Sequence, residues 1–139
     1  MKTSLAASAT AIAGLLLGGC ASTLAHINAP KLDYREYAGE PVKSFDLYHF
    51  DGWSAVSKDQ LVVWSGFNQA YLIRVTGYCP DLQYATTIAV TSTANQVDKF
   101  EKVIVGRDRC FINEIRPIDT KQMKADRKLI NEQRKQTGS

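Results

Sequence analysis

The stretch "LVVWSGFNQAYLIRVTG", residues 61–77, decides the fold class of this 139-residue chain. Its first part, residues 61–65, is a nearly continuous apolar run of strand length. A turn follows at residues 66–69, and residues 70–77 then alternate between apolar and polar side chains, as expected of a half-buried antiparallel strand. The stretch therefore predicts two neighbouring antiparallel strands that begin a meander.

Short strands are also expected upstream, on both sides of Asp51-Gly52. Residues 45–50 run into this dipeptide, and residues 53–56 leave it before a polar turn at residues 57–60. An Asp-Gly pair between β-rich segments is the strongest short hairpin signal. We therefore predict a two-residue hairpin here, with Phe50 and Trp53 facing each other across the strands.

Downstream, Pro80 stands where a helical turn can begin, so residues 80–85 are expected to form one short helix. Three apolar or β-branched runs follow at residues 86–91, 102–105 and 110–116, and Pro117 stops the last one. About six or seven short strands in so small a domain favour a mainly β fold, a small antiparallel barrel or roll, because closure removes exposed edges. We assign this β domain to residues 33–119.

Residues 120–139 differ in character and are predicted to form a basic C-terminal helix or tail. Asp119 and Gln122 form a start resembling a capping box, and glycine and proline are absent until Gly138. The apolar positions make only a narrow stripe, namely Met123, Ala125, Leu129 and Ile130. The helix is therefore expected either to pack lightly on the sheet or to fray into solvent.

At the other end, "AGLLLGGCAS", residues 13–22, follows Lys2 and an apolar run that is too short for a membrane span. Lys2, this run and Gly18-Gly19 match the order of a signal peptide, expected at residues 1–19. Leu17 to Cys20 also resembles the bacterial lipobox, which implies acylation of Cys20 and attachment to a lipid bilayer. An uncleaved anchor is the alternative. Residues 20–32 read as a flexible tether.

The compartment implied by this leader bears on the remaining cysteines. If Cys20 is acylated, Cys79 and Cys110 are left as an even pair in an oxidising space. Neither lies in a Cys-x-x-Cys motif, which argues against a redox role. We therefore predict a structural disulfide between them. Ala21 stands where enterobacterial lipoproteins that are retained in the inner membrane carry aspartate, so resemblance to that sorting pattern implies an outer-membrane location facing the periplasm.

Charge is divided along the chain. The total is +3, but residues 120–139 hold six Lys or Arg against two Asp or Glu and carry +4. The candidate binding residues of this segment are Lys121, Lys124, Arg127 and Lys128. They would attract an anionic envelope surface, although a solvated helix face is the commoner origin of such a run. A nucleic-acid partner is not expected, because no recognition motif accompanies the charge.

Residues for catalysis are few. His49 is the one histidine outside the tether and the signal peptide, and Asp51 would share its face on a strand. Ser65 lacks the glycine that a nucleophile elbow needs before it, and no metal-ligand cluster or phosphate-binding glycine loop occurs, so neither a metal nor a cofactor is expected. Most aromatic residues are expected in the core, whereas Trp53 and Phe67 lie beside turns and are candidates for exposed binding residues.

The Leu17–Cys20 lipobox, "DGW" at 51–53, "LVVW" at 61–64, "AYLIRVTGYCPDL" at 70–82 and "CFINEIRPID" at 110–119 together resemble a family of uncharacterised small lipoproteins of Gram-negative bacteria. The resemblance spans residues 37–119 and implies a periplasmic domain of unknown function. It supplies no functional residues. The basic tail is expected to be an addition particular to this chain.

Three functional hypotheses follow. The first is a non-catalytic envelope lipoprotein that binds a periplasmic protein or peptidoglycan partner through its sheet face or basic tail. The second, a narrower form, is a periplasmic inhibitor of a lytic enzyme. The third is a small hydrolase that uses His49.

Overall fold

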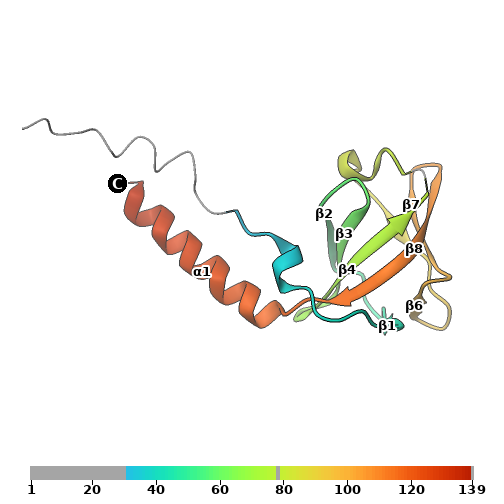
Figure 1. The fold of residues 1–139 in the computed structure, drawn as a ribbon, viewed down its shortest axis with the longest axis horizontal. Coiled ribbons are helices and arrows are strands. Elements are labelled where there is room, and N and C mark those ends of the chain that lie inside the picture. Colours follow the sequence, from blue (N-terminus) through green and yellow to red (C-terminus); the bar gives the residue numbers. More distant parts are fainter. Residues whose placement is uncertain (1–30, 78, 139) are drawn as a thin grey trace, which may run out of the picture.

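A computed structural model describes residues 31–77 and 79–138 as a curled half-barrel of antiparallel strands with one long helix (Figure 1). Six strands form the main sheet in the order β2-β3-β4-β8-β7-β5, and β1 and β6 form a separate two-stranded ribbon. The strands are β1 (Ser44–Asp46), β2 (Gly52–Ala55), β3 (Gln60–Gly66), β4 (Gln69–Thr76), β5 (Ala89–Val90), β6 (Gln96–Asp98), β7 (Lys102–Val105) and β8 (Asp108–Pro117). The mainly β prediction is confirmed.

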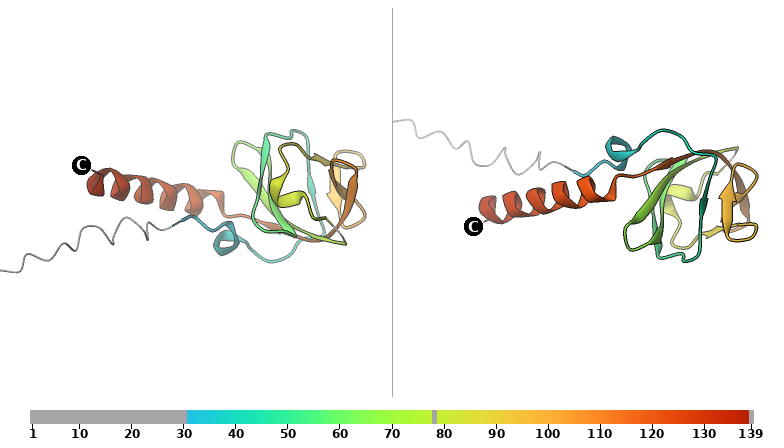
Figure 2. Two further views of the ribbon diagram at one scale, coloured as in Figure 1. Left: turned by 90° about the horizontal axis from the view of Figure 1, so that it is seen from above. Right: turned by 90° about the horizontal axis from the view of Figure 1, so that it is seen from below.

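Within the described residues, helical structure consists of two short 3₁₀ turns and one α-helix. η1 (Tyr34–Tyr37) precedes the strands, η2 (Leu82–Tyr84) lies within the predicted helical turn, and α1 (Thr120–Thr137) closes the described chain. Both views in Figure 2 show α1 extending away from the half-barrel, with η1 beside its first turns. None of the helices in residues 31–77 and 79–138 has the length and apolarity that a membrane crossing requires.

The β3–β4 pair forms the predicted meander and explains why residues 61–64 are continuously apolar. Leu61 and Val63 face the interior of the half-barrel, whereas Val62 belongs to a second apolar cluster on the outer face. All three are fully buried. A strand covered on both faces loses the alternation of apolar and polar residues that one-sided burial produces.

The main core lies inside the half-barrel and contains the disulfide. Cys79 and Cys110 are bonded, as the sequence predicts, with their Cα atoms 5.8 Å apart. Cys110 is fully buried on β8, and Leu82 of η2 is fully buried nearby in the same cluster. The disulfide therefore joins the segment that follows β4 to the centre of the sheet.

The predicted Asp51-Gly52 hairpin is wrong. β1 pairs with β6, with Phe45 opposite Val97, and β2 pairs with β3 across a turn in which Val56 N donates to Gln60 O at 2.9 Å. Phe45 is 5% exposed and its ring stacks on Tyr71, with the ring centroids 4.1 Å apart. This aromatic contact holds β1 over the sheet, so Phe50 and Trp53 do not form a cross-strand pair.

Two further expectations need correction. Of residues 86–91, only Ala89–Val90 form a strand, and β6 lies in a segment that the sequence indicated as loop. β6 follows a two-residue turn, Ala94-Asn95, in which both residues have positive φ angles of 51° and 61°. Asparagine tolerates this conformation, but alanine gives no signal for it. This turn was therefore not recognisable from the residues.

Candidate binding groove

Helix α1 begins at the cap that the sequence predicts. Asp119 Oδ1 accepts a hydrogen bond from Gln122 N at 3.0 Å, which satisfies one of the unpaired N–H groups at the helix start. The return bond of a capping box is absent among the described residues, because Asp119 N donates to Tyr37 O and the Gln122 side chain donates to Asp126. The cap thus connects α1 to η1.

On one side, α1 is held by the β3–β4 turn. Thr120 Oγ1 donates to Asn68 O at 2.7 Å, and Lys124 Nζ donates to Asn68 Oδ1 at 2.6 Å and to Phe67 O at 3.0 Å. The same ammonium lies 4.3 Å from the centroid of the Phe67 ring, a cation–π contact. Lys124 and Phe67, two separate candidates from the sequence, therefore meet in one contact that docks the helix.

On the other side, η1 and the second apolar cluster hold the helix. Met123 is fully buried in this cluster with Val62, Leu72 and Ile118. The Tyr37 hydroxyl donates to Asp126 Oδ2 at 2.8 Å, and this bond to a carboxylate raises the pKa of Tyr37 to about 12. From Asn131 to Gly138 every residue of the helix segment is exposed, so only its first half is docked.

A groove of about 590 Å³ lies beside this docked half, between η1, β2 and α1. Residues 31–35 form one wall and residues 54–56 of β2 form another. The helix contributes Arg127, Ile130, Asn131 and Arg134. Their spacing of three, four and seven residues places these four side chains on one face of α1.

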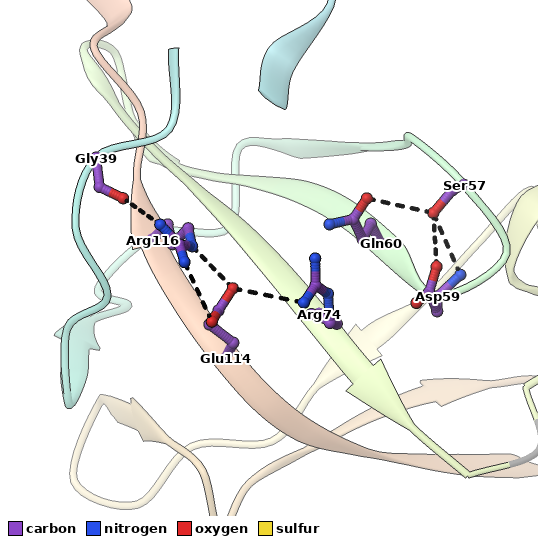
Figure 3. A network of polar contacts seen from close by, with 7 residues as sticks. All are labelled: Gly39, Ser57, Asp59, Gln60, Arg74, Glu114 and Arg116. Atoms are coloured by element: carbon purple, nitrogen blue, oxygen red, sulfur yellow. Dashed lines mark hydrogen bonds and ion pairs between the residues drawn. The ribbon is translucent and has the colours of Figure 1, made fainter. Parts of the chain in front are cut away.

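The groove is basic because two of its arginines have no acidic partner among the residues that the structure describes. Two arginines of the sheet are neutralised: Arg116 Nε donates to Glu114 at 2.8 Å, and Arg74 lies 3.9 Å from the same carboxylate (Figure 3). Within residues 31–77 and 79–138, no carboxylate lies within 4.0 Å of the guanidinium of Arg127 or Arg134.

The other lining charges partly cancel. Asp33 is paired with Arg35 at 2.7 Å, and this arginine holds the pKa of the Asp33 carboxyl below its usual range. A neighbouring hollow of about 350 Å³ shares Arg127 and Asn131 with the groove and adds Lys128. The two hollows together form a cationic surface along α1.

Comparison with known proteins bears on this whole arrangement. A family model described as a family of unknown function (DUF6491) matches residues 1–135. The chain belongs to the DUF6491 family. No curated protein and no solved structure matches it. The DUF6491 match extends through α1 as far as Lys135, so the expectation that the basic tail is an addition particular to this chain is wrong.

The remaining candidates of this DUF6491 chain are spread over its surface. His49 and Asp51 are exposed in the segment between β1 and β2, and within the described ranges the His49 side chain makes no hydrogen bond. Trp53 is half-buried and packs against the main core, so it is less available than expected, whereas Phe67 is 87% exposed. Lys121 is exposed outside both hollows.

Cys20, the signal peptide and nearly all of the tether lie outside the residues that the structure describes. Among those that it does describe, no group of three His, Cys, Asp or Glu side chains is placed to hold a metal ion. Sequence reasoning missed Ile130, Asn131 and Arg134 as groove residues. Their helical spacing with Arg127 was a usable signal, but the sequence did not indicate that residues 31–35 and 54–56 lie opposite them.

Proposed function

We propose that this DUF6491 chain is a non-catalytic binding protein of the cell envelope. In this proposal it is acylated at Cys20 and anchored in the outer membrane, facing the periplasm. It binds an acidic protein or peptidoglycan partner against α1. The observation that carries the proposal is the pair Arg127 and Arg134 in a groove of about 590 Å³ without carboxylate partners among the described residues.

Arginine suits this role because its planar guanidinium donates two parallel hydrogen bonds to one carboxylate. A periplasmic protein surface and the peptide stems of a cell wall both offer carboxylates. The apolar residues of the groove, Tyr34, Val56 and Ile130, add surface that a partner can bury. The seven-residue spacing of Arg127 and Arg134 places both on one helix face, and the docking of the first half of α1 positions that face at the groove.

The anchor is tested separately. Mass spectrometry of the purified protein should show a mature N-terminus at Cys20 with an acyl mass, and Cys20→Ser should move the protein from the membrane fraction to the soluble periplasm. An unmodified N-terminus upstream of residue 20 would overturn the lipoprotein part of the proposal without affecting the groove.

The partner is tested by a photo-crosslinking amino acid placed at Asn131, in the groove. Phe100, which is 87% exposed in the β6–β7 turn, is the control position. Figure 1 shows β6 on the side of the half-barrel away from α1. Irradiated cells should give a discrete adduct or peptidoglycan attachment from position 131 only, and Arg127→Glu with Arg134→Glu should abolish it. A lytic enzyme in this adduct would select the inhibitor hypothesis. Identical products from both positions would refute the groove.

A further inference from the structure

One edge of the main sheet opens on the groove. β2 is the first strand in the sheet order and pairs on one side with β3. Val56 N donates to Gln60 O, and hydrogen-bonded positions alternate along an antiparallel pair. The N–H and C=O groups of Trp53 and Ala55 therefore point away from β3.

Within the described residues, no backbone or side-chain hydrogen bond reaches these four outward groups. An unpaired strand edge of this kind is a template for another extended chain. Ala55 itself lines the groove, together with Ser54 and Val56. At Ala55 the unpaired edge therefore borders the same space as the cationic face of α1, whereas Trp53 lies outside the groove lining and η2 lies close to β2.

We propose that β2 receives an extended acidic segment of a partner protein as an additional β-strand. The proposal rests on the proposed function and specifies its binding mode. The backbone of the segment would pair with Ala55 and Trp53. Its side chains would alternate between the two faces of the strand, so that every second residue points to one side. Acidic residues at every second position, on the side that faces α1, would lie against Arg127 and Arg134.

A membrane surface fits the groove less well. A helix that lies on a bilayer needs an apolar face opposite its charged one. Along α1, Leu129 is the only large apolar side chain that is mostly exposed among the described residues. A flat bilayer also offers no backbone groups to pair with Ala55. An acidic protein strand would pair both with the arginine side chains and with the unpaired backbone groups of β2.

The experiment uses the purified protein and three probes: an acetylated peptide of four Thr-Glu repeats, the same peptide N-methylated at alternate residues, and a peptide of four Thr-Lys repeats. N-methylation removes N–H donors from the peptide without altering the protein. The variants are Arg127→Glu with Arg134→Glu, and Lys121→Glu as a control on the same helix outside both hollows. Calorimetry measures affinity, and amide exchange follows the Ala55 N–H.

The Thr-Glu peptide should bind, slow exchange of the Ala55 amide, and lose about tenfold in affinity in the double Arg variant but far less in Lys121→Glu. The N-methylated and Thr-Lys peptides should each bind about tenfold more weakly than the Thr-Glu peptide, because one cannot pair with the edge and the other meets like charge. High salt should weaken the first interaction.

The failures are distinguishable. If the N-methylated peptide binds as well as the parent while the double Arg variant weakens both, strand addition is refuted and acidic binding stands. If no peptide binds but vesicles of phosphatidylglycerol do, with the same Arg dependence, both the strand and the protein partner are refuted in favour of a membrane surface. If the double Arg variant binds the Thr-Glu peptide as tightly as the wild type, the groove is refuted as the binding site.

Discussion

Removing the disulfide is expected to cost a large share of the stability of the β domain. Cys79 and Cys110 are 31 residues apart in sequence, and Cys110 is fully buried at the centre of the sheet. Closing a loop of this length lowers the entropy of the unfolded chain by about 12 cal/mol/K, which corresponds to about 3.7 kcal/mol at 25 °C. Domains of this size have only about 5–15 kcal/mol in total.

The test compares urea unfolding of the wild type, of Cys79→Ala with Cys110→Ala, and of Cys20→Ala as a control outside the described β domain. Fluorescence of Trp53 and Trp64 reports on the fold, since both lie on the β2–β3 hairpin. With a slope of about 1–3 kcal/mol/M, the midpoint should fall by at least about 1 M in the double variant only. The slope should rise, because the unfolded chain without the cross-link exposes more surface. Equal midpoints, or two titratable thiols in the unreduced denatured wild type, would refute the reasoning.

Three further predictions concern α1 and the sheet face. Met123→Ala should cost about 2–5 kcal/mol in the docking of α1, seen as faster amide exchange in the helix with β4 and β8 unchanged, whereas Leu129→Ala, at a position that is 58% exposed, should change little. Ultraviolet titration should show one tyrosine that ionises near pH 12, and Asp126→Asn should remove this step because the carboxylate bond to Tyr37 raises its pKa. Arg116 lowers the pKa of Glu114 in the folded protein. The pair therefore stabilises the fold above the ordinary glutamate pKa, and its contribution is lost as the pH falls through the lowered pKa. Glu114→Gln should lower the urea midpoint at neutral pH and change it much less in acid.

Elements with a strong local signal were predictable from the sequence. β4 alternates, β7 and β8 contain apolar or β-branched runs bounded by turn residues, and α1 has its own cap at Asp119. The continuous apolar run of β3 predicted a strand. The sequence did not show why the run is continuous: one face of β3 packs in the main core, and the other packs in the cluster that contains Met123. Local pattern identified the strand, and long-range packing explained its composition.

The groove was not predictable in the same way, because its walls are distant in sequence. Residues 31–35, 54–56 and 127–134 meet only after the sheet has curled and α1 has docked. The charge count of the C-terminal segment indicated a cationic helix, but not which cations are neutralised. Lys124 is engaged with Asn68 and Phe67, whereas Arg127 and Arg134 line the groove without an acidic partner among the described residues.

The failed hairpin prediction and the unpaired edge of β2 have the same cause, which is that β1 pairs with β6 and not with β2. Had Asp51-Gly52 formed a two-residue hairpin, residues 45–50 would lie against β2 and their backbone would pair with Trp53 and Ala55. Instead Phe45 stacks on Tyr71, β1 pairs with β6, and β2 is left as the edge of the sheet. An Asp-Gly signal is worth little against the burial of a whole aromatic ring, which contributes about 1.5–3 kcal/mol. The same packing that overrides the turn exposes the strand edge on which the proposed binding mode depends.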